Sequence, residues 1–369
     1  MTFTFGLQQL PALKFLKLLS NVADSSRLCF NQPVILSAGD PMQTQDTKSK
    51  VESSTSRQVP TLSLGSYTQG SEADKTKFIE QLFTGIKDYG FIILKDHDVS
   101  QSLLKESYQV LEQFYKLPDQ KKRSYISEKG GGQRGYTAFG TEHAKGAEVK
   151  DLKEFWHVGR EVPDDHVFSK YYPKNIWPDD SVPEFRPIFE KLFSKLEQAG
   201  IQMMEALTYP LEVEKSYFKN MVEEGNSILR LLHYPPIPEG VDPRCIRAAA
   251  HEDINFITIL PAATQSGLQL KDRDGAWLDI QTDFGALIVD AGDMLARLTN
   301  DVIPSTTHRV INPQDGTNQS RYSMPFFMHP HPESLLSCLP SCKGNGAKYT
   351  DITAHEFLMQ RLREIGLVK

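Results

Sequence analysis

The chain has 369 residues, of which 39% are hydrophobic and 24% charged, and its formal net charge is -6 at pH 7. This length allows one large domain or two with a sizeable core. The negative charge argues against nucleic acid as the main partner. No apolar run reaches about 18 residues, which argues against a membrane span. Four irregularly spaced cysteines do not make a secreted disulfide framework, so we expect reduced thiols and a cytoplasmic location.

Residues 1–56 differ in composition from the rest of the chain. Residues 7–22 are largely apolar, but a proline and two lysines interrupt them, unlike the core of a signal peptide. Residues 40–58 are polar and rich in Ser and Thr, as disordered linkers are. We interpret residues 1–56 as a disordered or non-native extension, and organelle targeting is the alternative interpretation.

Helical and extended patterns then alternate, and we assign residues 57–180 to an N-terminal module of mixed secondary structure. The Gly-rich stretch 130–140 lacks a phosphate-binding signature, and we expect it to be a loop beside a pocket or on the surface. The spacing of apolar residues predicts, in order, a strand over 59–64, a helix over 75–90, a strand over 91–99, a helix over 100–118 and a strand over 151–161.

Residues 181–369 are predicted to hold a long support helix, a β-rich core over about 225–332 and a C-terminal helix. Asp274-Gly275 between two alternating segments predicts a hairpin, and a series of short strands indicates an antiparallel sandwich or barrel. We expect helices over 184–211 and 348–367, the latter capped by Asp351 or Thr353, and strands within 228–238, 248–260, 267–280, 286–298, 305–312 and 320–328.

His251 and Asp253 open the segment HEDINFITIL, which alternates and is rich in Ile, Phe and Thr, as strands are. Residues i and i+2 of a strand face the same way, so these two side chains are expected to project together while Glu252 faces away. A second imidazole, from His308, would complete the facial triad of a non-haem Fe(II) site. An H-x-D pair alone is more often a buried ion pair, and only its context favours a metal site.

Arg321 and Ser323 are likewise two residues apart on an expected strand. A guanidinium and a hydroxyl on one face suit the binding of a carboxylate, although an R-x-S pair alone is also typical of a surface strand. His329-Pro330-His331 is a competing pair of imidazoles, but its prolines cannot donate to a strand ladder. The other histidines are interpreted as structural or solvated.

The segments HEDINFITIL, GDMLARLTND, STTHRVINP and RYSMPFF, with YGFIILKDHDV nearer the N-terminus, resemble the iron(II)/2-oxoglutarate-dependent dioxygenases of the isopenicillin N synthase-like family. The resemblance runs from about residue 59 to the end of the chain. It implies a fold that is mainly β with flanking helices: a double-stranded β-helix (jelly roll) core preceded by a helical and mixed N-terminal module.

The resemblance also implies Fe(II), 2-oxoglutarate as co-substrate and O2, the oxidation of a small organic substrate, and release of succinate and CO2. The metal and co-substrate carry the chemistry, so no further catalytic side chain is expected. Plant members commonly have Asn at the position of Leu232. The implied residues are His251, Asp253 and His308 for the metal, Arg321, Ser323 and Tyr234 for 2-oxoglutarate and, by analogy, Phe155, His157 and Phe327 at the border of the substrate pocket.

Three alternatives remain at this point. Same-fold Fe(II) oxidases of the isopenicillin N synthase or aminocyclopropane-carboxylate oxidase kind do not use 2-oxoglutarate, and there Arg321 would hold a substrate carboxylate or bicarbonate. A zinc hydrolase uses the same kinds of ligand, and a non-catalytic jelly roll retains them without activity. The sequence leaves open the substrate, the type of oxidation and the oligomeric state.

Overall fold

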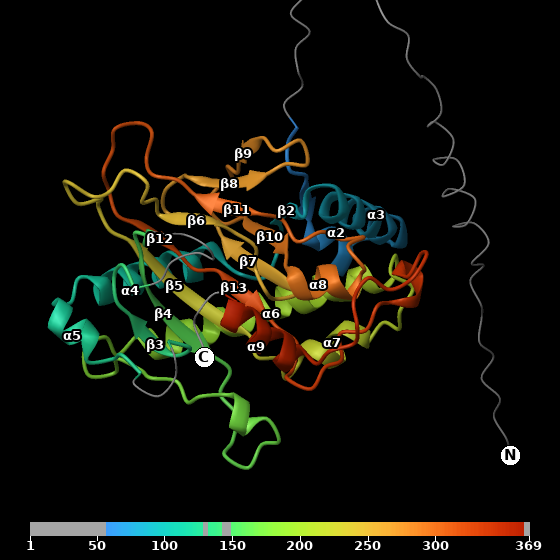
Figure 1. Ribbon diagram of the computed structural model, residues 1–369, viewed down its shortest axis with the longest axis horizontal. Coiled ribbons are helices and arrows are strands. Elements are labelled where there is room, and N and C mark those ends of the chain that lie inside the picture. Colours follow the sequence, from blue (N-terminus) through green and yellow to red (C-terminus); the bar gives the residue numbers. More distant parts are fainter. Residues whose placement is uncertain (1–56, 128–131, 142–148, 365–369) are drawn as a thin grey trace, which may run out of the picture. The chain divides into compact units, whose positions relative to one another are not determined.

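The computed structural model describes residues 57–127, 132–141 and 149–364 (Figure 1). The extension that the sequence predicts over residues 1–56 lies outside the described residues. The described residues belong to one compact unit. Within the described ranges, no helix combines the length and the apolar character needed to cross a bilayer.

Two β-sheets form the centre of the fold, as the mainly β prediction requires. Strands of the predicted N-terminal module and of the predicted core lie in the same nine-stranded sheet, and the second sheet has four strands. The larger sheet runs β1 (Thr61–Ser63), β2 (Phe91–Lys95), β10 (Leu287–Ala291), β7 (Ile257–Pro261), β13 (Phe326–Met328), β5 (Ile228–Tyr234), β4 (Glu154–Gly159) and β3 (Gly135–Thr137), with β12 (Arg321–Ser323) also paired to β5; the smaller runs β6 (Ala248–His251), β11 (His308–Val310), β8 (Leu268–Lys271) and β9 (Trp277–Asp279).

The two sheets face each other across a small apolar core. Leu232 and Ile288 of the larger sheet pack in one buried cluster with Leu270 and Val310 of the smaller sheet. The side chains meet because each strand presents alternate residues to the space between the sheets. This arrangement is the predicted jelly roll, in which β6 and β11 pack against the larger sheet (Figure 1).

Helices cover the outer face of the larger sheet and build the main hydrophobic core with it. The predicted apolar stripe of α6 (Phe185–Thr208) is buried, and this helix contacts β7 and β13. α3 (Glu72–Tyr89) is capped at its start by a Ser71–Asp74 capping box and at its end by Gly90, whose φ of 68° suits glycine. The other helices are α2 (Leu64–Thr68), α4 (Gln101–Tyr115), α5 (Asp119–Arg123), η2 (Ser169–Tyr171), α7 (Tyr217–Val222), α8 (Asp293–Leu298), η3 (Pro340–Cys342) and α9 (Ala354–Glu364).

Three of the predicted strands differ from the observed elements. The strand predicted over 248–260 is two strands, since the chain leaves β6 after His251 and resumes at β7. The segment predicted as a strand over 286–298 becomes helical at Asp293. Residues 320–328 divide at Pro325, which cannot donate to a ladder, into β12 and β13. The predicted hairpin around Asp274-Gly275 forms between β8 and β9, and Thr353 caps α9 through a reciprocal pair of hydrogen bonds with Glu356.

Candidate active site

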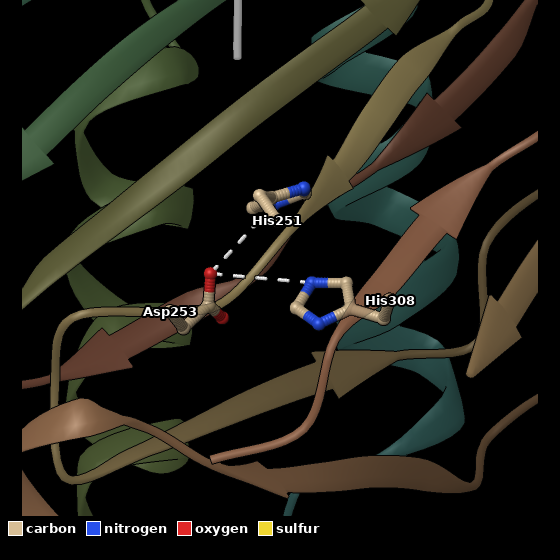
Figure 2. Close-up of side chains that lie close together, drawn as sticks. All are labelled: His251, Asp253 and His308. Atoms are coloured by element: carbon tan, nitrogen blue, oxygen red, sulfur yellow. Dashed lines mark ion pairs between the residues drawn. The ribbon is translucent and has the colours of Figure 1, made fainter. Parts of the chain in front are cut away.

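His251, Asp253 and His308 converge at one end of the smaller sheet (Figure 2). His251 is the last residue of β6 and His308 the first of β11, and the two are direct partners across this antiparallel pair. Asp253 Oδ1 lies 3.8 Å from His251 Nε2 and 4.0 Å from His308 Nε2. One ligand atom from each residue lies within 4.8 Å of the other two, and among the described residues this is the only such group of three.

Asp253 reaches the cluster from a loop, so the expectation that it shares a strand face with His251 is wrong. The loop is held from the other side by the start of α8, because the Asp293 amide donates to the Asp253 carbonyl at 2.7 Å. Gly292 allows this close approach, since a Cβ there would lie 2.8 Å from the Asp253 carbonyl oxygen. Glu252 stays outside the cluster and accepts a hydrogen bond from Thr307 Oγ1.

The orientation of both imidazoles is fixed by backbone carbonyls. His251 Nδ1 lies 2.7 Å from the Ala249 carbonyl oxygen, and His308 Nδ1 lies 3.2 Å from that of Thr306. A carbonyl only accepts, so each Nδ1 carries the proton and each Nε2 presents its lone pair to Asp253. The backbone of β6 and of the segment just before β11 thereby sets the tautomers of the two rings.

The cluster favours the protonation states that a divalent metal needs. Desolvation, followed by the neighbouring His308, lowers the pKa of His251 to about 4. Burial acts to raise the pKa of Asp253, but His308, His251 and the Thr258 hydroxyl outweigh it and hold this pKa below its usual value. A neutral His251 imidazole beside an ionised Asp253 carboxylate fits a bound Fe(II).

A second layer of side chains holds the Asp253 carboxylate. Thr258 Oγ1 donates to Asp253 Oδ2, and Asn255 Nδ2 donates to Thr258 Oγ1 at 2.9 Å. Asp290 of β10 is buried behind them, and burial, followed by the charge of Asp253, raises the pKa of Asp290 well above its usual value. No direct signal in the sequence points to these partners, because only the fold brings them together.

Arg321 and Tyr234 are direct partners across β12 and β5, and Ser323 lies opposite Leu232. The Arg321 guanidinium lies 5.0 Å from the centre of the Tyr234 ring and donates from Nε to the Gln265 carbonyl. Arg321 is only 2% exposed, yet its Nη1 has no hydrogen-bond partner. A buried cation with an unused donor is costly without an anion, so this group fits a carboxylate of 2-oxoglutarate.

A cavity of about 740 Å³ opens beside His251 and Asp253, and Phe155, His157 and Phe327 also line it. The structure therefore brings the three predicted pocket residues together with part of the metal cluster. Three charged residues that the sequence did not predict also line the cavity. Arg230 lies 4.4 Å from the Phe155 ring centre and 5.3 Å from that of Phe327, and its Nε donates to His157 Nε2 at 2.6 Å. Asp151 and Lys153, an ion pair at 2.9 Å, also line the cavity.

Strand alternation could have predicted two of these charged residues, Arg230 and Lys153, as cavity residues. Arg230 lies four residues before Tyr234 on β5, and Lys153 lies two residues before Phe155, so each shares a face with a predicted site residue. The Gly-rich stretch borders the cavity, as one of the two expectations for it stated, because Gly132 and Gln133 line it. It is not a loop throughout, since it contains β3.

The competing His329-Pro330-His331 pair does not form a metal cluster in the described part of the chain. His329 lines the cavity, and burial lowers its pKa to about 4. His331 instead stacks on the ring of Phe168, with centroids 5.1 Å apart. The imidazoles of His329 and His331 thus lie in different surroundings and do not form a pair.

Comparison with known proteins assigns the chain to a family. Residues 59–180 match the family described as "non-haem dioxygenase in morphine synthesis N-terminal", and residues 225–330 match the 2OG-Fe(II) oxygenase superfamily. The 2-oxoglutarate-Fe(II) type oxidoreductase hxnY of Emericella nidulans is 30% identical over 313 residues, which cover 81% of this chain and 88% of that protein.

Solved structures agree with this assignment. A putative 2OG-Fe(II) oxygenase family protein from Caulobacter crescentus is 43% identical, with a TM-score of 0.75 over 83% of this chain and 98% of that one. A Neurospora crassa protein solved in complex with alpha-KG and thymine is 29% identical, with a TM-score of 0.74 over 83% of this chain and 96% of that one. The chain belongs to the 2OG-Fe(II) oxygenase superfamily. It is an oxidoreductase that uses Fe(II), 2-oxoglutarate and O2.

Proposed function

We propose that the chain oxidises a small organic molecule bound in the 740 Å³ cavity, with His251, Asp253 and His308 as the ligands of Fe(II). The observation that carries this proposal is the opening of the cluster onto a cavity with aromatic walls. Two imidazoles and one carboxylate leave further positions on a six-coordinate metal for the co-substrate and O2.

Arg321, Ser323 and Tyr234 are proposed to hold the distal carboxylate of 2-oxoglutarate. The unpartnered and buried Nη1 of Arg321 supports this role, as does the pairing that sets Tyr234 directly opposite it. Leu232 is apolar and belongs to the inner core, so it supplies no polar contact to the co-substrate. The anchor therefore depends on the guanidinium, the hydroxyl of Ser323 and the phenol.

In this proposal the protein orients the reactants and limits the access of water. Bound Fe(II) would supply the redox chemistry by which 2-oxoglutarate and O2 are consumed and succinate and CO2 released. Thr258 and Asn255 hold the Asp253 carboxylate in place, and the aromatic rings of Phe155 and Phe327 make part of the cavity wall apolar. No side chain is required as a general acid or base.

Anaerobic titration of the Fe(II) protein with 2-oxoglutarate tests the proposal. We expect the weak visible charge-transfer band of a chelated 2-oxo acid and, in air, formation of succinate. An oxidase that does not use 2-oxoglutarate would give neither signal but would still consume O2 with its substrate. Activity with zinc in place of iron and without O2 would instead support a hydrolase.

The substrate is proposed to be a small molecule rather than a nucleic acid. The similar Neurospora crassa protein has been solved with thymine and with 5-formyluracil, so these two bases are the first members of a substrate panel. A substrate is identified when it raises succinate release above the uncoupled rate and is itself oxidised. If only polynucleotides stimulate succinate release, the proposal is wrong.

A reducing, cytoplasm-like location is proposed as well. Three cysteines in the described part of the chain, Cys245, Cys338 and Cys342, are free thiols, and two of them are buried. Such thiols suit a compartment that keeps cysteine reduced. Fractionation of the source cells with antibody detection would test the location.

A further inference from the structure

A second arginine is buried near the proposed co-substrate anchor. Arg247 immediately precedes β6 and is 2% exposed, as Arg321 is. Its Nη2 donates to the carbonyl of Gln319 at 2.8 Å, two residues before Arg321, while its Nε has no hydrogen-bond partner. The backbone of Arg247 is also fixed, because its amide donates to Asn312 Oδ1 at 3.1 Å.

Arg247 lies between the smaller sheet and the segment before β12, since it immediately precedes β6 and its Nη2 donates to the Gln319 carbonyl. Simple alternation does not relate it to His251, because the register of β6 on β11 shifts between Ala248 and His251. His251 faces the metal cluster between the sheets. Arg247 thus approaches from the smaller sheet, while Arg321 belongs to the larger one.

The two guanidinium groups lie close enough to affect each other. Burial, followed by the positive charge of Arg321, lowers the pKa of Arg247 to about 10, and burial also lowers the pKa of Arg321. The Tyr234 phenol partly opposes this effect, since it acts to raise the pKa of both arginines. In the described ranges neither arginine forms an ion pair with a carboxylate. Two buried cations that repel each other are costly unless an anion binds with them.

We propose that Arg247 is a second guanidinium of the co-substrate anchor, which acts with Arg321 on the distal carboxylate of 2-oxoglutarate. The inference rests on the proposed role of Arg321. It adds a residue that the R-x-S motif does not contain. The two unused donors, Arg247 Nε and Arg321 Nη1, are the atoms available to this anion.

The test compares two 2-oxo acids that differ only in the distal carboxylate. Dissociation constants of 2-oxoglutarate and 2-oxobutanoate are measured by anaerobic titration of the full-length Fe(II) protein and, independently of activity, by calorimetry on the Zn(II) protein. For Arg247→Met we expect 2-oxoglutarate to bind on the order of ten- to a hundredfold more weakly, as when a charge-assisted hydrogen bond is lost. Binding of 2-oxobutanoate should change less than about twofold, since it lacks the carboxylate that the lost charge contacts.

Arg244→Met is the matched control, because Arg244 lies in the same segment but is paired with exposed Asp242, and both affinities should stay unchanged. Equal loss for the two acids in Arg247→Met, or no loss for either, overturns the inference. If that variant does not fold, Arg247→Lys replaces it and should retain part of the selectivity for 2-oxoglutarate; equal affinity changes for both acids again overturn the inference. Unchanged 2-oxoglutarate binding in Arg321→Met would refute the anchor itself, whatever Arg247 does.

Discussion

His251 and His308 lie directly opposite each other on β6 and β11, and their ring centroids are 4.5 Å apart. The backbone pairing of two short strands therefore sets the distance between the two imidazoles that are proposed to bind the metal. Asp253, the third residue of the cluster, approaches both imidazoles from a loop. Preorganisation of this kind reduces the conformational entropy that the protein loses when the metal binds.

Removal of one imidazole tests this arrangement. We expect His308→Ala to bind Fe(II) far more weakly than the wild type, by more than the roughly 10- to 100-fold typical of losing an outer-layer partner. The reason is that two remaining ligands, His251 and Asp253, do not hold a divalent ion against water. Metal content after anaerobic reconstitution and succinate formation are the measurements.

His331→Ala is the control, since His331 stacks on Phe168 outside the cluster. It should retain iron close to the wild-type amount. Equal iron binding by His308→Ala and the wild type would show that the cluster is not the metal site.

Thr258 gives a second prediction, because its hydroxyl donates directly to the Asp253 carboxylate. Thr258→Val keeps the shape of the side chain but removes the donor, and we expect a roughly 10-fold weaker affinity for Fe(II). Thr258→Ser keeps the donor and should stay within about threefold of the wild type. Competition with a chromogenic chelator measures both variants. A serine variant as weak as the valine variant would mean that packing, and not the hydrogen bond, is responsible.

Strand alternation placed Arg321 and Ser323 correctly but misplaced Asp253. Arg321 and Ser323 share a face because β12 contains both, as alternation required. Asp253 lies near His251 as predicted, but not because the two share a strand, since HEDINFITIL alternates and yet the chain leaves the sheet after His251. That break depends on hydrogen bonds to residues near Gly292, far away in the sequence, which a local pattern does not contain.

Pocket residues were predictable only in part for a similar reason. Phe155 and His157 line the cavity, whereas Glu154 and Trp156, which alternate with them, are buried on the other face of β4. Alternation separates these two sets but does not say which face encloses a cavity, because both are covered. The choice depends on which sheet or helix packs on each face, and this follows from the fold as a whole.

Gly292 provides a third prediction, which concerns the loop that carries Asp253. A Cβ at this position would overlap the carbonyl and side-chain oxygens of Asn255 and press on the Asp253 carbonyl. Gly292→Ala should therefore displace the loop, lower the unfolding free energy by about 1–3 kcal/mol and weaken Fe(II) binding. Gly65→Ala is the control, since its Cβ would meet only ordinary contacts of 3.4 Å or more. Wild-type metal affinity in Gly292→Ala would mean that the loop adapts without moving the ligand.

Glu154 supports the opposite face of β4 and gives a prediction on pH. Its carboxylate is 5% exposed and accepts hydrogen bonds from Lys122 Nζ and His233 Nδ1, both at 2.7 Å, and from the Tyr136 hydroxyl. Burial acts to raise the pKa of Glu154, but these partners hold it below its usual value. The ionised group therefore stabilises the fold above the unfolded-state pKa of about 4.3, and this contribution is lost as the pH falls through the lower folded-state pKa.

Glu154→Gln should accordingly lower the unfolding free energy at pH 7 by about 3 kcal/mol, because it leaves the buried Lys122 ammonium without its anion. Urea unfolding of the variant and the wild type at pH 7 and near pH 3 measures the difference, which should shrink at the lower pH as wild-type Glu154 becomes protonated. Glu112→Gln is the matched control: its ion pair with Lys116 is solvent-exposed, so we expect a change below about 1 kcal/mol at either pH. A stability difference between Glu154→Gln and the wild type that is absent at pH 7, or equally large near pH 3, would show that the ionised carboxylate does not stabilise this face of the sheet.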